Sequence, residues 1–335
     1  MNKQKINIVD TTLRDGSHAV SHSYSVDQVK AIAGGLDKVG IKMIEVSHGD
    51  GLAGSSINYG FSKTPEMELI KAAKSVIHHS KLCVLLLPGI GTIEDLKQAV
   101  ESGAEAVRVA THVTEADISI QHLKYAKSIG MMTVGFLMMS HMASPEKILE
   151  QAKIFVDCGV DYINIADSAG YMTTDDVKAR ISLLVEKLDT PIGFHSHNNL
   201  GLSIANSMAA LEEGATYIDV SCCGIGAGAG NTQGEVLAAV LDRLGYDTGI
   251  DIYGLMDVAE KIVKPVMHRP QVINTASLML GYAGVYSSFL LHTYRAAEKF
   301  NLNPRDILVE LGRRKMVGGQ EDMIVDVAYA LSQKK

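Results

Sequence analysis

Two histidines separated by one residue, His195 and His197, follow the apolar pair Gly193-Phe194 and could together bind a metal ion. In a β-strand, side chains at positions i and i+2 project from the same face, so the two imidazoles would point in one direction. The same spacing also fits two histidines that only hydrogen-bond their neighbours at the end of a strand. A metal site would therefore need a third ligand from another part of the chain.

Asp15 is the candidate for that third ligand, because it follows the first apolar run in the segment Thr11-Thr12-Leu13-Arg14-Asp15-Gly16. One carboxylate and two imidazoles leave coordination positions open for a substrate. This mixed set of oxygen and nitrogen ligands suits a divalent Mn, Co, Fe or Zn ion that takes part in catalysis, rather than a closed structural site. We therefore expect a metal ion held by Asp15, His195 and His197.

The neighbouring residues indicate which chemistry such a metal would serve. No lysine stands at the end of any apolar run described below, so an aldolase that works through a lysine Schiff base would have no nucleophile. If the reaction cleaves a carbon–carbon bond, a metal that chelates a 2-oxo acid would have to accept the electrons. Arg14 could stabilise the negative charge that develops, and His18 could move a proton at neutral pH. A salt bridge for Arg14 and a surface position for His18 are the competing interpretations.

The elements that must position these residues alternate between apolar runs and segments with helical periodicity. Near-continuous runs of Val, Ile and Leu are typical of parallel strands that are buried on both faces. Eight of them predict an α/β fold of the TIM (β/α)8 barrel type, whose active site lies at the carboxyl ends of the strands. A doubly wound open sheet would give a similar alternation, but no nucleotide-binding fingerprint accompanies it. The predicted strands cover residues 6–12, 43–48, 81–87, 106–112, 133–139, 162–167, 191–197 and 217–222.

Cap and turn residues support this alternation. Ser25-Val26-Asp27-Gln28 has the pattern of a capping box, Thr92 also precedes a predicted helix, and Ser144-Pro145 places proline at a first helical position. His48 and His112, at the ends of their runs, are expected to form hydrogen bonds at the barrel mouth. Glycines that supply the left-handed conformation of a helix C-cap stand at Gly40, Gly103, Gly130, Gly159 and Gly214.

After about residue 251 the alternation stops and only helical patterns follow. We therefore expect a catalytic barrel over residues 1–250 and a smaller C-terminal helical domain over residues 251–335. Ser287 could cap one of the helices of this second domain. The expected helices cover residues 287–300, 304–311 and a final stretch after Gly319.

The glycine-rich segment 224–230 follows the eighth apolar run. Its glycines alternate with single residues and do not form the G-x-G-x-x-G pattern with an acidic residue about 20 positions later that a dinucleotide-binding site requires. We expect instead that this segment lets the backbone pass close to the barrel mouth.

The composition is that of a soluble globular protein, and it argues against several classes of partner. With 335 residues, 47% of them hydrophobic, the chain can bury a sizeable core. A net charge of −7 and the lack of a long basic run argue against nucleic acid. No apolar run approaches the ~18 residues of a membrane span and no signal peptide precedes the first strand, so we expect a cytoplasmic protein without a membrane partner. The four cysteines form no C-x-x-C pattern and are expected to be reduced.

The segment 11–16 together with His195-Ser196-His197-Asn198 resembles the metal-dependent lyase superfamily that includes hydroxymethylglutaryl-CoA lyase and isopropylmalate synthase. Those enzymes usually continue T-L-R-D-G with one residue and then glutamine, whereas this chain has Ser17-His18. This difference makes the chain similar to the 4-hydroxy-2-oxovalerate aldolase family, and the resemblance covers nearly the whole sequence. Further segments that carry it are 85–92, 281–289 and 318–323.

The resemblance implies a Mn²⁺-dependent retro-aldol cleavage of 4-hydroxy-2-oxopentanoate to pyruvate and acetaldehyde, in the catabolism of aromatic compounds. Co²⁺ or another divalent metal could take the place of Mn²⁺. At the positions that match the family, Asp15, His195 and His197 would hold the metal, and Asp15 and His195 would also contact the substrate.

The resemblance also implies roles for residues around the metal. Arg14 would bind the substrate and stabilise the pyruvate enolate, and His18 would be the base for the substrate hydroxyl, directly or through water. Ser168 and Tyr286 would contact the substrate. Because Tyr286 belongs to the helical domain, that domain would close over the barrel mouth.

A partner protein follows from the same resemblance. The helical domain would dock an acylating acetaldehyde dehydrogenase in a heterotetramer, and acetaldehyde would pass to it through a channel. Gly318-Gly319 falls near that passage, although a loop before a helix is an equal interpretation.

Two alternatives stay open. One is an acyl-CoA condensing synthase or lyase of the same superfamily, of the isopropylmalate synthase or hydroxymethylglutaryl-CoA lyase type, against which Ser17-His18 argues. The other is a barrel kept only to bind the dehydrogenase, against which the complete set of candidate metal ligands argues.

Overall fold

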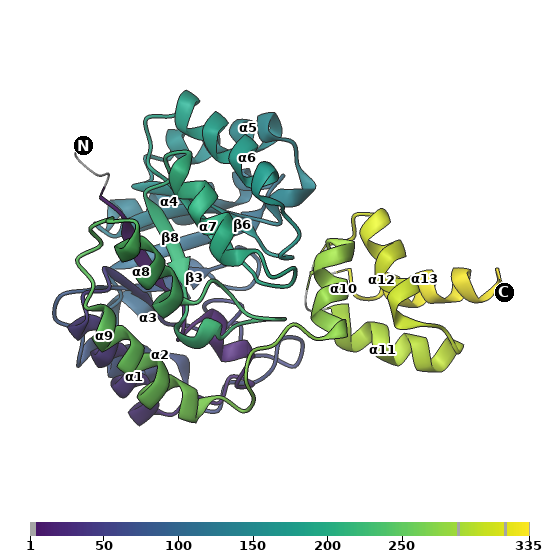
Figure 1. Ribbon diagram of the computed structural model, residues 1–335, viewed down its shortest axis with the longest axis horizontal. Helices are drawn as coiled ribbons and strands as arrows, with labels where there is room; N and C mark the ends of the chain where they lie inside the picture. Colours follow the sequence, from purple (N-terminus) through teal and green to yellow (C-terminus); the bar gives the residue numbers. More distant parts are fainter. Residues whose placement is uncertain (1–4, 287–288, 318–319, 335) are drawn as a thin grey trace.

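The computed structural model describes residues 5–286, 289–317 and 320–334. Its first part is a closed barrel of parallel strands that lie in sequence order from β1 to β8, with β8 paired back to β1. Figure 1 shows helices around this barrel and a smaller group of helices at one side. The predicted TIM barrel with a C-terminal helical domain is thereby confirmed. The strands are β1 (Asn7–Asp10), β2 (Met43–Glu45), β3 (Lys81–Leu86), β4 (Ala106–His112), β5 (Met132–Met138), β6 (Tyr162–Asp167), β7 (Ile192–Ser196) and β8 (Tyr217–Val220).

Each strand coincides with a predicted apolar run to within a few residues. The bounds of β4 and β6 match at both ends. The predictions extend past the observed carboxyl ends of β1, β2, β7 and β8, because the residues there belong to the loops of the barrel mouth. Near-continuous apolar character predicted these strands well, since nearly all of their residues are buried.

The helices of the barrel begin and end where the cap residues predict. Ser25 and Gln28 form the capping box of α1, Thr92 forms that of α3, and Ser144 caps α5 with proline behind it. The predicted C-cap glycines have positive φ angles between 71° and 109°. No helix in the described ranges is both long and apolar enough to cross a membrane. The barrel helices are α1 (Val26–Lys38), α2 (Glu66–Lys74), α3 (Ile93–Glu101), α4 (Ile120–Ser128), α5 (Pro145–Asp157), α6 (Thr174–Lys187), α7 (Ser203–Glu212) and α8 (Gly234–Arg243).

Short 3-10 and π segments complete the barrel and its loops. They are η1 (Asp15–His18), η2 (Ala116–Ser119), η3 (Ser140–Met142), η4 (Cys222–Gly224), the π-helix η5 (Val258–Val263) and η6 (Lys264–Val266).

The inside of the barrel is filled in layers. An apolar layer closes the end at which the strands begin and includes Val9, Met43, Val134 and Tyr162. A second apolar cluster, formed by Leu85, Ala110, Phe136 and Ala166, lies near the mouth. Charged side chains lie on the strand positions between them and are described with the site below.

The helical domain has an apolar core of its own, which includes Leu280, Phe289, Ile307 and Val327. These side chains lie on one face of each helix, as the amphipathic pattern requires. The domain consists of α10 (Thr275–Ala283), α11 (Phe289–Phe300), α12 (Pro304–Arg313) and α13 (Met323–Ser332).

The helices that follow residue 251 divide between the two cores. Leu255 of α9 (Ile252–Asp257) and Val258 and Val263 of η5 belong to the barrel core, and both segments pack against α1. Met267 also packs on that core. We therefore propose that the helical domain expected over residues 251–335 begins only after Met267.

A polar contact between His141 and Gly284 joins the barrel to the helical domain. Nε2 of His141, on η3, lies 3.1 Å from the carbonyl oxygen of Gly284, the left-handed C-cap of α10. Burial lowers the pKa of His141 to about 4, so the imidazole is neutral at pH 7 and its Nε2–H donates to the carbonyl. Protonation of this ring is unfavourable inside the folded junction.

His141 should therefore make the stability depend on pH. Its pKa is lower in the folded chain than in the unfolded chain, so the unfolded chain binds the extra proton as the pH falls from about 6.5 to about 4. We expect the wild type to lose about 2 kcal/mol between pH 7 and pH 5 that the variant His141→Gln does not lose. Urea unfolding at both pH values measures this difference. His292→Gln, at an exposed position, is the control, and an equal loss in His141→Gln would disprove the assignment.

Candidate active site

The three predicted metal ligands come together at the barrel mouth. Asp15 begins η1 shortly after β1, His195 lies on β7, and His197 follows the end of β7. The Nε2 atoms of the two histidines are 3.3 Å apart, and Oδ2 of Asp15 lies 3.7 and 3.8 Å from them. All three side chains are buried. These separations and donor types fit a divalent ion bonded to all three atoms at roughly 2.0–2.2 Å.

Asp219 sets the orientation of the first histidine. Its Oδ2 lies 2.9 Å from Nδ1 of His195, so Nδ1 carries the proton and Nε2 presents its lone pair to the centre. Burial opposes the charge on Asp219, but Arg108 and His195 together lower the pKa of this carboxyl. A histidine held by a carboxylate in this way is the usual arrangement around a metal ligand.

A buried network of charges extends below the centre. Arg14 donates from Nε to Oε2 of Glu45 and from Nη1 to Oδ2 of Asp15, at 2.6 Å in each case. Arg108, on β4, donates to Asp219, and its Nε lies 3.5 Å from Glu45. Glu45, Arg108 and Asp219 were not predicted from the sequence. The signal that could have revealed them is a charged residue at an inward-facing position of an otherwise apolar strand.

The glycine-rich segment 224–230 passes close to the barrel mouth, as predicted, and there it contacts Asp15. The backbone N–H of Ala227 donates to Oδ1 of Asp15 at 3.0 Å, and a Cβ on Gly226 would lie 2.8 Å from the same oxygen. Burial opposes the charge on Asp15, but Arg14 and the nearby histidines lower the pKa of this carboxyl well below its usual range. The carboxylate is therefore charged and ready to bind a cation.

Asn231 is a further polar residue of the centre that the sequence analysis missed, since a lone asparagine carries no pattern. It forms a bridge with His197 through the backbone, and a Cβ on Gly226 would lie 2.6 Å from its Nδ2. Among the described residues its buried Oδ1 has no hydrogen-bond partner. An unpaired oxygen this close to a carboxylate suits a site that receives a cation.

The structure brings nearly all predicted site residues into one inner cavity. Its walls carry the three ligands, Arg14 and Ser168, and Tyr286 reaches it from the helical domain. Oγ of Ser168 accepts the N–H of Met139 at 3.0 Å, and among the described residues none accepts a hydrogen bond from this hydroxyl, so its hydrogen can bond a ligand. Apolar side chains complete the lining, namely Leu85, Leu87, Phe136, Met138 and Ala166.

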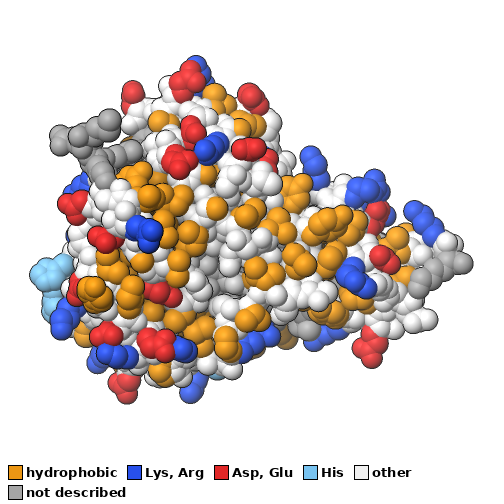
Figure 2. All heavy atoms as spheres, in the orientation of Figure 1, with side chains coloured by type: hydrophobic (Ala, Val, Ile, Leu, Met, Phe, Trp, Pro, Cys, Tyr) orange, Lys and Arg blue, Asp and Glu red, His pale blue; other side chains and the backbone are white. Residues whose placement is uncertain are grey.

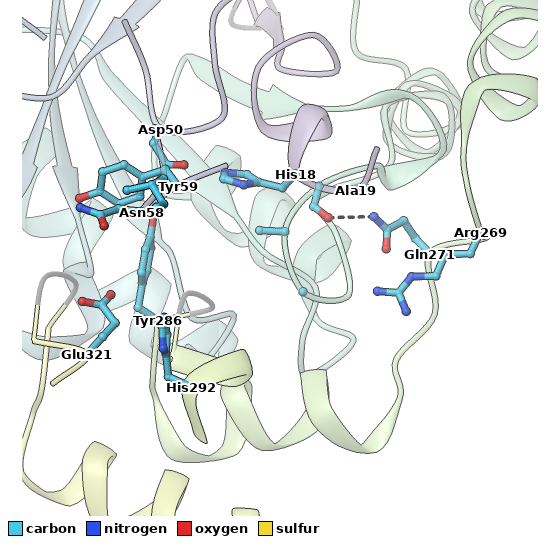
Figure 3. Close-up of a pocket in the computed structure, with 14 residues that line it drawn as sticks. His18, Ala19, Asp50, Asn58, Tyr59, Arg269, Gln271, Tyr286, His292 and Glu321 are labelled. Atoms are coloured by element: carbon cyan, nitrogen blue, oxygen red, sulfur yellow. Dashed lines mark hydrogen bonds between the residues drawn. The ribbon is translucent and has the colours of Figure 1, made fainter. Parts of the chain in front are cut away.

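His18 lines a neighbouring outer cavity of about 550 Å³ instead. Figure 3 shows Tyr286 rising from the helical domain toward Asp50 and Tyr59, while His18 points into the cavity from η1. Asp50 and Tyr286 line both cavities. His18 therefore lies beside the entrance to the inner cavity rather than in its wall.

The remaining histidine predictions are confirmed. Nε2 of His48 lies 3.1 Å from the carbonyl oxygen of Gly60, and Nδ1 of His112 lies 2.9 Å from Oγ1 of Thr114. Two predictions lie outside the described residues, namely Ser287 as a cap and Gly318-Gly319 near a passage.

The chain is similar to known proteins over nearly its whole length. Residues 5–262 match the HMGL-like family, and residues 271–333 match the DmpG-like communication domain. A 4-hydroxy-2-oxovalerate aldolase from Moorella thermoacetica is 68% identical over 335 residues, which cover 100% of this chain and 99% of that protein. One from Carboxydothermus hydrogenoformans is 61% identical over 330 residues, which cover 98% of each chain.

The barrel also has solved structural counterparts. The carboxyl transferase domain of pyruvate carboxylase from Rhizobium etli superposes with a TM-score of 0.82 at 16% identity, covering 99% of this chain and 61% of that chain. At this identity the similarity shows the fold alone.

The close approach of the glycine-rich segment predicts that Gly226→Ala weakens metal binding. The added Cβ would push against Oδ1 of Asp15 and Nδ2 of Asn231. We expect a loss of about 10- to 100-fold in Mn²⁺ affinity, the range seen when groups that orient metal ligands are disturbed. Isothermal titration calorimetry measures it. Gly34→Ala, whose Cβ would meet its nearest neighbour at 3.6 Å, should bind Mn²⁺ like the wild type.

The buried charges predict a large effect of Arg108→Met on stability. This change leaves Asp219 without its arginine and Glu45 with one cation fewer. Breaking a buried ion pair from one side typically costs about 3–5 kcal/mol. Urea unfolding should show a loss of this size, whereas Lys97→Met, which breaks the exposed pair with Glu94, should change little. A loss below about 1 kcal/mol in Arg108→Met would contradict the network.

Proposed function

Since this chain belongs to the HMGL-like family and, within it, to the 4-hydroxy-2-oxovalerate aldolases, we propose that it cleaves 4-hydroxy-2-oxopentanoate to pyruvate and acetaldehyde. The observation that carries the proposal is the convergence of Asp15, His195 and His197 in one cavity with Arg14. The match to the DmpG-like communication domain supports this aldolase over an acyl-CoA synthase or lyase of the superfamily.

The centre suits a divalent metal, and we propose Mn²⁺, with Co²⁺ as a possible substitute. Two neutral imidazoles and one carboxylate make a ligand set that such ions accept. Burial lowers the pKa of His197 to about 4, which keeps its nitrogen lone pair available at pH 7. When bound, the metal supplies a Lewis acid for the carboxylate and carbonyl oxygens of a 2-oxo acid.

Arg14 is placed to meet the negative charge that develops when the carbon–carbon bond breaks. Its bonds to Glu45 and Asp15 use Nε and Nη1 and hold the guanidinium in one orientation. Among the described residues none forms a hydrogen bond with Nη2, and the side chain lines the inner cavity. A cation fixed in this way needs no reorganisation during the reaction, which is the basis of electrostatic catalysis.

His18 is the proposed base for the substrate hydroxyl. It lies where the outer cavity meets the inner one, so it can accept the proton directly or through one water molecule. Ser168 and Tyr286 offer hydroxyl groups on the inner wall that can hydrogen-bond the substrate. The apolar residues Leu87 and Met138 would face the methyl end of the substrate.

We further propose that the helical domain binds an acylating acetaldehyde dehydrogenase as part of a heterotetramer. The communication-domain match over residues 271–333 supports this partner. Exposed aromatic side chains of the domain, Tyr282, Tyr294 and Tyr329, are of the type enriched in protein interfaces. Figure 2 shows hydrophobic side chains spread from the barrel across the junction onto this domain. Passage of acetaldehyde to the partner, a cytoplasmic location and a place in aromatic catabolism belong to the same proposal.

Pyruvate release by chelator-treated protein tests the function directly. With 4-hydroxy-2-oxopentanoate as substrate and lactate dehydrogenase as the coupling enzyme, pyruvate should appear only after Mn²⁺ is added back. Asp15→Ala should lower the rate at least about 100-fold, because one metal ligand and the partner of Arg14 are lost. Asp306→Ala, at an exposed position in the helical domain, is the matched control.

Two outcomes would contradict the proposal. The first is pyruvate release that persists without any divalent metal or in Asp15→Ala. The second is release of thiol from acetyl-CoA with a 2-oxo acid in the absence of aldol cleavage, which would indicate the acyl-CoA class instead.

A further inference from the structure

A second cluster of metal-binding side chains lies beside the first, and two of its three members line the outer cavity. It consists of His18 on η1, His22 just after η1 and Asp50 in the loop after β2. One ligand atom from each of these residues lies within 4.8 Å of the other two. We propose that this cluster is a separate binding site for a divalent transition metal ion, with Zn²⁺ the best match.

The ligand types favour zinc. Two imidazoles and one carboxylate, with one position left for water or substrate, form a common zinc site. The ligand atoms must approach by about 1 Å to reach zinc bond lengths of roughly 2.0–2.2 Å. His18 can make this movement because it is only partly buried and faces a cavity, while the other two ligands are buried.

Asp50 supplies the strongest physical argument. The residue is 8% exposed, and within the described ranges no lysine or arginine forms an ion pair with it. Its nearest basic atom is Nδ1 of His48 at 3.6 Å, but that nitrogen accepts the backbone N–H of Asp50 and therefore carries no proton of its own to offer. A largely buried carboxylate without a cation is costly, and a metal ion would compensate its charge.

The ring of His22 is fixed in place by hydrogen bonds and by stacking. Oγ of Ser17 donates to the carbonyl oxygen of Arg14 at 2.6 Å, so it can only accept from Nδ1 of His22 at 3.1 Å. The backbone of Tyr59 also forms a hydrogen bond with this ring, and a metal bound to His22 would have to take the place of that bond. The ring also stacks on His48 with centroids 3.8 Å apart, which limits its rotation.

Gly49 lets the imidazole of His18 reach the site. A Cβ at this position would lie 2.5 Å from Cε1 and Nε2 of His18, so the imidazole packs directly on the backbone next to Asp50. Any other residue at position 49 would push the ring away from the cluster.

Occupation of this site would regulate the reaction. His18 is the base in the proposed function, and a metal bound to its ring would remove the lone pair that accepts the substrate proton. This part of the inference rests on the proposed function. Excess Zn²⁺ should therefore inhibit by filling the second site, even while the first site keeps its own metal.

Counting bound metal tests the site without any assay of activity. Metal-free protein is dialysed against buffers of defined free Zn²⁺, and zinc per chain is measured by mass spectrometry. We expect two zinc ions per chain for the wild type, one for Asp15→Ala and one for His22→Phe, which keeps an aromatic ring on His48. His79→Ala removes an exposed histidine and should still bind two.

Several results would overturn the inference. The first is that the wild-type chain binds a single zinc ion even when the free Zn²⁺ concentration is 100-fold above the one that saturates the first site. The second is that the His22→Phe variant still binds two zinc ions per chain. If His22→Phe fails to fold, as judged by loss of cooperative unfolding, Asp50→Asn is the nearly isosteric replacement and should also bind one ion. Because no substrate is used, failure of the aldolase assay leaves the metal count unaffected, and a failed metal count leaves the aldolase assignment intact.

Discussion

The barrel mouth depends on one network of buried charged side chains. It runs from Arg14 through Glu45 and Arg108 to Asp219. Taking these charges out of water is expensive, and their mutual attraction repays the cost only while every partner is in place. The benefit of such a network is therefore geometric. It holds a guanidinium on one side of the metal centre and His195 on the other, with little freedom for either to move.

The barrel makes this network possible because its lower end is sealed. The apolar layer that contains Met43 and Tyr162 keeps water from the charged layer above it. In this low-dielectric interior the hydrogen bonds to Asp219 are stronger than they would be at the surface, and the charge of Arg14 is less screened by water. The strength of the network and the electrostatic field at the barrel mouth thus depend on the same exclusion of water.

Much of the fold and part of the site could be predicted from the sequence. Strands buried on both faces are visible in the sequence as continuous apolar runs. His195 and His197 are two positions apart, so the period of a strand was enough to predict that their side chains share one face. The pairing of Glu45 and Asp219 with Arg108 could not be found in this way. A charged residue in an apolar strand marks a position, but it does not identify a partner that lies on another strand far along the chain. The helical domain that we propose to begin after Met267 could not be delimited from the sequence for a related reason: α9 has the same helical pattern whether it packs on α1 or on α10.

The helical domain matters to the site through Tyr286, which lines both cavities together with Asp50. A substrate or product that moves between the cavities must pass these two side chains and His18. Asp50 raises the pKa of the Tyr286 hydroxyl further than burial alone does, so this hydroxyl stays neutral and can act as a hydrogen-bond donor at the passage. Because Tyr286 belongs to one domain and Asp50 to the other, any shift of the helical domain against the barrel would change the width of this passage and the surroundings of His18 together.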